Sequence, residues 1–225
     1  FAKSGTNLFA GNQGNGVFLS TDNGASWTAV NNGLTNTNVF SLAVMGSNIF
    51  ASTLSSGIFL STNNGASWAD VKNNMPDYSI QDLAVSGPYL LASTYGGGIY
   101  RTSNNGANWT AVNSGLISNL VGDLYVTGTS IYATSSNSGV YLSHNNGSGW
   151  NLINSNIRVS NFAGTDNDLY AGTGNGVFHS TNNGLNWTDS SLIGINISAI
   201  EYSGSDLYAG TYSNGIYHST SYGAN

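Results

Sequence analysis

The sequence has no cysteine, only two prolines and few charged side chains, which make up 6% of its 225 residues. Without cysteine the chain can form neither a disulfide nor a cysteine-ligated metal site. This absence leaves the redox compartment open, because exported proteins without disulfides are common. Charged residues usually make up about 25% of a soluble domain. The surface of this protein is therefore predicted to be solvated mainly by neutral Asn, Ser, Thr and Gly.

Basic residues are especially scarce. Four Lys and Arg stand against ten Asp and Glu, which gives a net charge of −6. A nucleic-acid-binding surface needs a basic patch or stripe, so we expect no nucleic-acid partner. No run approaches the ~18 apolar residues of a membrane-spanning helix, and residues 1–5 show no signal-peptide pattern. We also expect no membrane insertion by this segment.

What the sequence does contain is an eight-residue phrase that occurs five times, called the repeated phrase below. The copies are STDNGASW at 20–27, STNNGASW at 61–68, TSNNGANW at 102–109, SHNNGSGW at 143–150 and STNNGLNW at 180–187. Their tryptophans, at 27, 68, 109, 150 and 187, are separated by 41, 41, 41 and 37 positions. Self-similarity at such a period indicates a repeat architecture.

Each repeat is predicted to form four short strands joined by tight turns. In the second repeat, strands are expected at about 39–44, 49–53, 58–61 and 68–71, with Gly, Asn and Ser between them. This pattern predicts a four-stranded antiparallel meander, and blades of this kind packed around an axis form a β-propeller. The expected fold class is thus all-β, a β-propeller of four-stranded antiparallel blades.

Six repeat units are visible, and the sixth is incomplete. The third strand of each unit is expected to open with a glycine, at 16, 57, 98, 139, 176 and 215. We expect a single propeller domain over residues 1–225, with repeat units at about 1–37, 38–78, 79–119, 120–158, 159–196 and 197–225. Residues 219–225, STSYGAN, repeat the phrase without its tryptophan. Because an unpaired blade edge is a liability, we expect the sequence to be a portion of a longer chain.

The repeated phrase resembles the Asp-box, or BNR, repeat, whose pattern is Ser or Thr, any residue, Asp, any residue, Gly, any two residues and Trp. Ser20 begins the one copy that matches in full, and the other four match when Asn replaces Asp. The matching positions are Asp22, Gly24, Trp27, Asn63, Gly65, Trp68, Asn104, Gly106, Trp109, Asn145, Gly147, Trp150, Asn182, Gly184 and Trp187. Such repeats occur in sialidases, sortilin-type receptors, xyloglucan-degrading enzymes, photosystem assembly factors and bacterial secreted or surface proteins. The resemblance implies a β-propeller and an extracellular or cell-surface location.

The composition of the repeated phrase favours a structural role over a binding site. An Asp or Asn oxygen can accept backbone N–H groups of the turn, and Asn-Gly suits the positive φ angles of such turns. The tryptophan places a large ring at the start of the fourth strand, where it can cover the turn and the neighbouring sheet, with its indole N–H free to find an acceptor. Calcium prefers carboxylate ligands, and among the five copies only Asp22 supplies one. We therefore predict neither a metal nor a cofactor.

Candidate binding residues are expected in the loops at the opposite end of each meander from the repeated phrase, because function on a repeated scaffold is found in variable loops. Tyr78, Tyr95 and Tyr212 are aromatic residues in otherwise small polar segments, and Arg158 lies in a connection between units. An exposed tyrosine can stack on a sugar or anchor a protein, although isolated surface aromatics are common. We predict a non-catalytic interaction module for a protein or a glycan.

Two alternatives to a binding module stay open. The first is a glycan-cleaving enzyme, because Asp82 and Asp123 occupy equivalent positions in neighbouring first strands, and carboxylates about 5–9.5 Å apart can cleave glycosides. A sialidase is excluded, because resemblance to that family requires three arginines and the chain has only Arg101 and Arg158. The second alternative is a structural spacer or fibre component without a ligand, which the low charge and monotonous loops favour.

Overall fold

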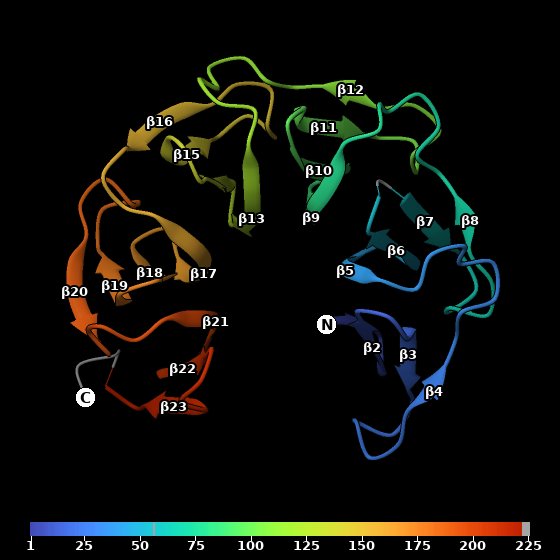
Figure 1. Cartoon of the computed structure of the whole chain (residues 1–225), viewed down its shortest axis with the longest axis horizontal. Helices are drawn as coiled ribbons and strands as arrows, with labels where there is room; N and C mark the ends of the chain where they lie inside the picture. Colours follow the sequence, from blue (N-terminus) through green and yellow to red (C-terminus); the bar gives the residue numbers. More distant parts are fainter. Residues whose placement is uncertain (56, 222–225) are drawn as a thin grey trace. The chain divides into compact units, whose positions relative to one another are not determined.

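The computed structural model describes residues 1–55 and 57–221, and these residues form strands and turns without any helix (Figure 1). Every sheet is an antiparallel meander in which strands consecutive in the sequence are hydrogen-bonded neighbours. Five sheets have four strands, and the sixth has three within the described residues. The prediction of an all-β propeller of four-stranded blades is confirmed. The last part of the incomplete sixth phrase, residues 222–225, lies outside the described residues.

The chain forms two compact units, and the first comprises Phe1–Asn113 and Asn119–Val121. It contains blades 1 to 3. Blade 1 consists of β1 (Ala2–Ser4), β2 (Asn7–Asn12), β3 (Gly16–Ser20) and β4 (Thr28–Ala29); blade 2 of β5 (Val39–Met45), β6 (Asn48–Thr53), β7 (Gly57–Ser61) and β8 (Ala69–Asp70); and blade 3 of β9 (Ser79–Ser86), β10 (Tyr89–Tyr95), β11 (Gly98–Thr102) and β12 (Thr110–Ala111). The fourth strands have two residues each, fewer than the four expected at 68–71.

The second unit comprises Ser114–Ser118 and the described residues from Gly122 onward. It contains blades 4 to 6, except for Val121, the first residue of β13, which belongs to the first unit. Blade 4 consists of β13 (Val121–Thr127), β14 (Ser130–Ser135), β15 (Gly139–Ser143) and β16 (Asn151–Asn154); blade 5 of β17 (Val159–Thr165), β18 (Asp168–Thr173), β19 (Gly176–Ser180) and β20 (Thr188–Ser191); and blade 6 of β21 (Ile197–Ser203), β22 (Asp206–Thr211) and β23 (Ile216–Ser219).

Hydrophobic cores lie between adjoining blades of each unit. Phe9 and Val17 of blade 1 pack with Ile49 and Phe59 of blade 2, and a second cluster joins blades 2 and 3. In the second unit, one cluster joins blades 4 and 5 and another joins blades 5 and 6. Because both faces of an internal sheet meet a neighbour, each blade depends on its neighbours for burial of its side chains.

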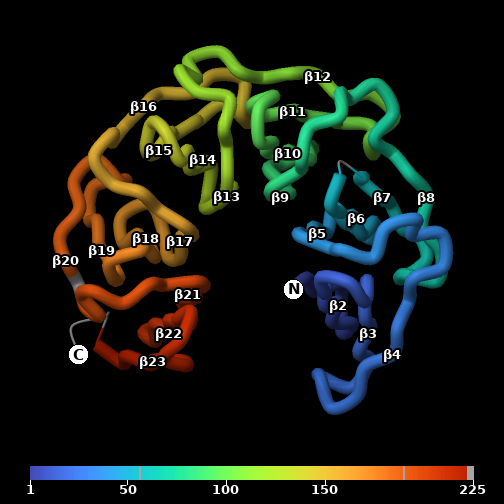
Figure 2. The backbone as a smooth tube through the Cα atoms, viewed as in Figure 1, coloured from blue at the N-terminus to red at the C-terminus, as the bar shows by residue number. Residues whose placement is uncertain are grey.

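The meander topology separates the two ends of every blade. The hairpin between first and second strands and the hairpin of the repeated phrase lie at the same end, as the hydrogen bond from the Asn183 N–H to the Asp166 carbonyl shows (3.1 Å). The hairpin between second and third strands lies at the other end, together with the crossover, the segment that joins one blade's fourth strand to the next blade's first strand (Figure 2). The sequence segments that vary among repeats thus share one end of the blades.

In the described part of the chain, no helix is long and apolar enough to cross a membrane.

Candidate functional site

The repeated phrase folds into the same hydrogen-bonded hairpin in all five copies. In the first copy, the Ser20 hydroxyl donates to Asp22 Oδ1 (2.8 Å) and accepts from the Gly24 N–H (2.8 Å), while Asp22 Oδ1 also accepts from the Ser26 N–H (2.9 Å). The same three bonds recur around Asn63, Asn104, Asn145 and Asn182. An amide oxygen therefore replaces the carboxylate without loss of the turn.

The Asn-Gly pair inside the repeated phrase is required by the backbone. Asn64 has a φ of 56° and Gly65 one of 83°, and the other four copies have similar values. Left-handed backbone of this kind favours Gly, with Asn the next most tolerated residue. Most polar groups of the hairpin are thus hydrogen-bonded to one another. Few of them remain available to bind a ligand.

Asp22 is the one carboxylate in these hairpins, and its own turn lowers its pKa from 3.8 to about 2. The main cause is the Ser26 hydroxyl, which donates to Asp22 Oδ2 (2.6 Å), followed by the Ser26 N–H and the Ser20 hydroxyl. All three donors stabilise the charged form. Any stability from this charge is therefore present above pH 3.8 and is lost as the pH falls through about 2.

We expect Ser26→Ala to raise the pKa of Asp22 toward its ordinary value, because the substitution removes the strongest donor to the carboxylate. The measurement is an NMR titration of the Asp22 carboxyl carbon. Ser67→Ala is the matched control, since Ser67 occupies the same position in the second copy and bonds to the neutral Asn63. An Asp22 titration that is identical in Ser26→Ala and in the parent would contradict this assignment.

Two tryptophans of the first unit, in blades 2 and 3, each form a hydrogen bond to the preceding blade. The indole N–H of Trp68 donates to the Val30 carbonyl of blade 1 (2.7 Å), and that of Trp109 donates to the Val71 carbonyl of blade 2 (2.9 Å). Their exposed fractions are 5% and 4%. The sequence predicted that the ring covers its turn and the neighbouring sheet and that its N–H finds an acceptor, but it did not predict that the acceptor is a carbonyl of the preceding blade. These tryptophans are interblade clamps.

The crossovers complete the clamps. The Trp68 N–H donates to the Asn32 carbonyl (2.8 Å), and the Asn74 side chain both accepts from the Trp109 N–H (2.8 Å) and donates to the Trp109 carbonyl (2.9 Å). In the second unit the Trp150 N–H likewise donates to the Ser114 carbonyl (2.9 Å). These three crossovers thereby cover the backbone of the next blade's tryptophan.

Trp187 of blade 5 departs from this arrangement. Its indole Nε1 is buried yet has no hydrogen-bond partner in the described chain, and its ring is only half-buried. The preceding crossover bonds to this hairpin through one side chain, with Asn154 Nδ2 donating to the Leu185 carbonyl (3.2 Å). Trp187 therefore has the position of a clamp residue without the bonds of a clamp.

Two local shortenings explain the difference. The first shortening is in the crossover, measured from a blade's tryptophan to the equivalent residue in the first strand of the next blade. This distance is twelve positions from Trp27 to Val39 and from Trp68 to Ile80, but nine from Trp150 to Val159. The hairpin loop between second and third strands has three residues in blades 2 and 3, between the pairs Thr53–Gly57 and Thr94–Gly98, but two in blade 5, between Thr173 and Gly176. Three positions lost in the crossover and one in the loop account for the step of 37 instead of 41.

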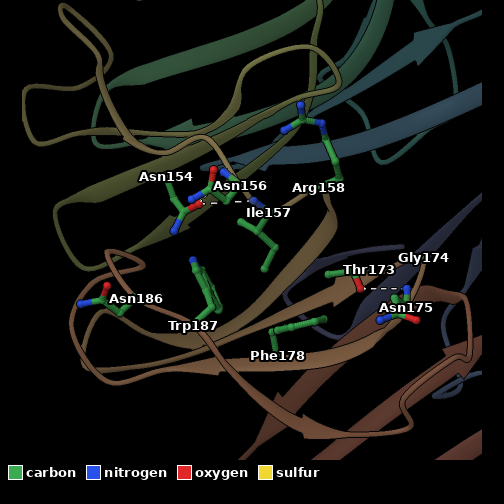
Figure 3. A pocket seen from close by; sticks show the side chains of 10 residues that line it. All are labelled: Asn154, Asn156, Ile157, Arg158, Thr173, Gly174, Asn175, Phe178, Asn186 and Trp187. Carbon is green, nitrogen blue, oxygen red and sulfur yellow. Dashed lines mark hydrogen bonds between the residues drawn. The ribbon is translucent and has the colours of Figure 1, made fainter.

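The shortened segments border an open pocket of about 570 Å³. Figure 3 shows the rings of Trp187 and Phe178 on one side of it and the crossover, with Ile157, on the other. The ten lining residues are Asn154, Asn156, Ile157, Arg158, Thr173, Gly174, Asn175, Phe178, Asn186 and Trp187. Two aromatic rings, four amides and one guanidinium thus face a single space, and none of these ten residues is acidic.

The polar groups around the pocket are unevenly engaged. Asn154 is fixed, because its Oδ1 accepts from the N–H groups of Asn156 (2.8 Å) and Ile157 (3.3 Å). The side-chain amides of Asn175 and Asn186, in contrast, bond to no other group of the described residues, and both residues are exposed. Free amides beside aromatic rings can bind a ligand that has both hydroxyl groups and an apolar face.

The aromatic residues behind Trp187 form a rigid support. The Phe162 ring lies 6.2 Å from the Trp187 ring and contacts the rings of Tyr125 and Tyr132. Burial, followed by the charge of Glu201, raises the pKa of Tyr125 to about 12, and its hydroxyl donates to the Gly164 carbonyl (2.6 Å). Burial and then Asp166 raise the pKa of Tyr132, whose hydroxyl donates to that carboxylate (3.1 Å). Both tyrosines therefore remain neutral donors at physiological pH.

The structure brings only one of the four predicted binding residues to this pocket. Arg158 lies at its rim, exposed, with its guanidinium donating to the Ser155 carbonyl (3.0 Å). Tyr78 is half-buried near Gly97 in blade 3, Tyr95 is 56% exposed in the first unit, and Tyr212 is 84% exposed in blade 6. Trp187 and Phe178 were not predicted from the sequence as lining residues. The irregular tryptophan step of 37 was the available signal.

The two candidate catalytic carboxylates belong to different units. Asp82 of β9 is half-buried and accepts a hydrogen bond from the Ser41 hydroxyl of blade 2 (2.6 Å). Asp123 of β13 is half-buried, and its N–H bonds to Thr134 Oγ1 (2.8 Å). Neither residue lines the pocket of blade 5.

The repeated blades define the class of fold as a β-propeller, and solved structures of that class resemble this chain. An ancestral GH74 enzyme matches with a TM-score of 0.78 and 22% identity over 95% of this chain, and YCF48 bound to D1 peptide with 0.75 and 18% over 96%. The extracellular domain of the putative one component system BT4673 from B. thetaiotaomicron matches with 0.73 and 18% over 94%.

These similarities show the fold alone, because all identities are low. The chain spans 34% of the length of the GH74 enzyme, 75% of YCF48 and 31% of the BT4673 chain. No known protein-family pattern matches the sequence. No curated protein matches it either.

Proposed function

We propose that this chain is a non-catalytic binding module of an exported or cell-surface protein, built as an Asp-box propeller, and that it binds through the crossover and loop end of its blades. The observation that carries the proposal is the pocket of about 570 Å³ at blade 5. Its volume is in the range of small-molecule sites, and its lining combines aromatic rings with a few polar groups, as such sites do.

The different roles of the two ends of each blade support this proposal. The repeated phrase bonds mainly to itself and holds the hairpin, while the pocket is lined by the crossover before blade 5 and the loop of blade 5, both of which are shorter than their counterparts in blades 2 and 3. Binding residues on a repeated scaffold are expected where the repeat varies. A non-catalytic role is favoured because no carboxylic acid lines the pocket to serve as a general acid or base.

Export is supported by composition and by comparison. The low share of charged residues and the Asn-rich repeated phrase are similar to bacterial secreted and surface repeats, and the BT4673 relative is described as an extracellular domain. The peptide bound to YCF48 is a precedent for ligand binding on this fold. A protein or a glycan is the proposed partner class.

Filling the pocket tests the proposal. Gly174 lines the pocket, and a Cβ there would meet nothing within 4 Å, so Gly174→Trp introduces a ring at the pocket without a clash at its Cβ. Ser136→Trp is the matched control, because Ser136 is an exposed residue at the same loop position of blade 4. The immobilised chain would be screened against a glycan array and a panel of extracellular proteins. We expect retention of a ligand that Gly174→Trp weakens at least tenfold and Ser136→Trp does not.

Other outcomes would point to the alternatives. Retention of no glycan and no protein would reject the binding module and favour the structural spacer. Release of shortened glycans, abolished by Asp82→Asn or Asp123→Asn, would favour the glycan-cleaving enzyme. Ligand retention that Gly174→Trp leaves unchanged would place the binding surface elsewhere, with exposed Tyr95 and Tyr212 as the next residues to substitute.

A further inference from the structure

The blade 5 pocket lies where blades 2 and 3 have an interblade clamp, and the differences from a clamp indicate what the pocket can bind. In blades 2 and 3 the indole N–H of the clamp tryptophan reaches a backbone carbonyl of the preceding blade, and Asn32 or Asn74 of the crossover bonds to the tryptophan backbone. In blade 5 the crossover is three residues shorter, and the Trp187 N–H reaches no acceptor in the described chain. The shorter crossover leaves the half-buried Trp187 ring, together with the Phe178 ring, beside the open space of the pocket.

Resting on the proposed function, we propose that the pocket binds one pyranose residue of a glycan, which stacks on Trp187 and Phe178 and hydrogen-bonds through its hydroxyl groups to the side-chain amides of Asn175 and Asn186. A pyranose has hydroxyl groups around its edge and a C–H face that packs against an aromatic ring. Both features have a counterpart among the ten lining residues.

The polar lining fits hydroxyl groups better than charged ligands. The unengaged amides of Asn175 and Asn186 each offer two donors and an acceptor, which is the pattern that a hydroxyl group needs. The exposed Arg158 is the only charged residue of the lining, and its guanidinium already donates to the Ser155 carbonyl. A phosphate-bearing ligand would need more cations than this pocket supplies.

The support behind the ring makes the site preformed. Trp187 rests on Phe162, and Phe162 is held by Tyr125 and Tyr132, which are anchored through their hydroxyls. Asn154 and Ile157 are fixed on the opposite wall by the bonds around Asn154. A ligand therefore loses little free energy to ordering of the protein.

The test uses the indole N–H signals of the five tryptophans in ¹H–¹⁵N NMR spectra of the intact chain, with the Trp187 signal assigned through Trp187→Phe. The probes are the methyl glycosides of glucose, galactose, mannose, xylose and glucuronic acid, with glycerol as a polyol without a ring. We expect at least one pyranoside to shift the Trp187 signal, while glycerol does not and the signals of Trp68 and Trp109, which have protein acceptors, do not move.

A crossover graft provides a second variant. Residues 154–158 are replaced by residues 31–38, the eight-residue crossover of blade 1, which restores the three missing positions. We expect the graft to cover Trp187 and to abolish the pyranoside shift, and Gly174→Trp to abolish it without any change in the crossover. Persistence of the shift in both variants would overturn the proposal.

The two proposals fail in different ways. A Trp187 signal that stays still with all five pyranosides, while the intact chain retains a ligand that Gly174→Trp releases, overturns the pyranose and keeps the binding module. An equal shift of the signal of Trp27, which is 38% exposed, would indicate unspecific stacking and would also overturn the pyranose site. Retention of no ligand in any assay, together with a silent Trp187, would reject both.

Discussion

Replacing Trp109 with alanine is expected to lower the free energy of unfolding by about 3–5 kcal/mol, the range for removal of a large buried aromatic side chain. Trp109 is 4% exposed and belongs to the core that joins blades 2 and 3, with Phe50, Ile58 and Met75. The substitution also leaves the Val71 carbonyl without its indole donor (2.9 Å). The lost packing and the lost hydrogen bond both weaken the contact between blades 2 and 3.

Trp187→Ala is the matched comparison, since Trp187 occupies the same position of the repeated phrase. We expect it to cost roughly half as much, because the ring is half-buried and its N–H has no partner among the described residues. The measurement is urea unfolding of the parent and of both variants, followed by circular dichroism. Equal losses for the two variants would show that the clamp bond and the deeper burial of Trp109 do not distinguish the two positions.

The sequence predicted the parts of this fold that depend on local chemistry. The Asn-Gly pairs and the recurring glycines required left-handed backbone at fixed intervals, and the short apolar runs between them predicted strands. The Asp22 and Asn63 turns differ in charge and share one geometry, which the oxygen-acceptor argument anticipated. Local pattern was sufficient because each blade is a meander of consecutive strands.

The pocket could not be predicted from local pattern, because it lies where the crossover and the hairpin loop are shorter than in the other repeats. The tryptophan step of 37 is visible in the sequence. It does not show whether the shorter repeat has a tighter turn, a shorter strand or a crossover that leaves the next blade's tryptophan uncovered. That outcome depends on the contact between a crossover and the next blade, which is a tertiary property. Residues chosen for being aromatic in a loop, such as Tyr95 and Tyr212, are not among the lining residues of the pocket, whereas Trp187 was assigned only to the hairpin.

The interblade bonds were missed for a related reason. An indole N–H can be expected to find an acceptor, yet the choice between its own turn and the carbonyl of the preceding blade depends on how two sheets approach. Val30 and Val71 are held within their own blades by N–H groups that donate to the Val17 and Ile58 carbonyls, and their carbonyls accept from the indoles of the next blade. Sequence spacing shows the recurrence of the tryptophan without showing its partner.

Gly33→Ala is expected to destabilise the first unit by about 2–5 kcal/mol, the sum of a strained backbone and a steric clash. Gly33 has a φ of +91°, and a Cβ at this position would lie 2.2 Å from the Trp68 carbonyl oxygen. The atom in its way is backbone and cannot rotate aside. The crossover would have to move from Trp68, and the bond from the Trp68 N–H to the Asn32 carbonyl would weaken with it.

Gly46→Ala separates the two causes. Gly46 also has a positive φ, +64°, but a Cβ there would meet nothing within 4 Å. It should therefore cost only the backbone strain of about 1–2 kcal/mol. The difference between the two variants, measured by thermal and urea unfolding, reports how tightly the crossover packs on the next blade's tryptophan. If Gly33→Ala proved as mild as Gly46→Ala, the crossover would have room to move, and a longer crossover could not be what covers the clamp tryptophans in blades 2 and 3.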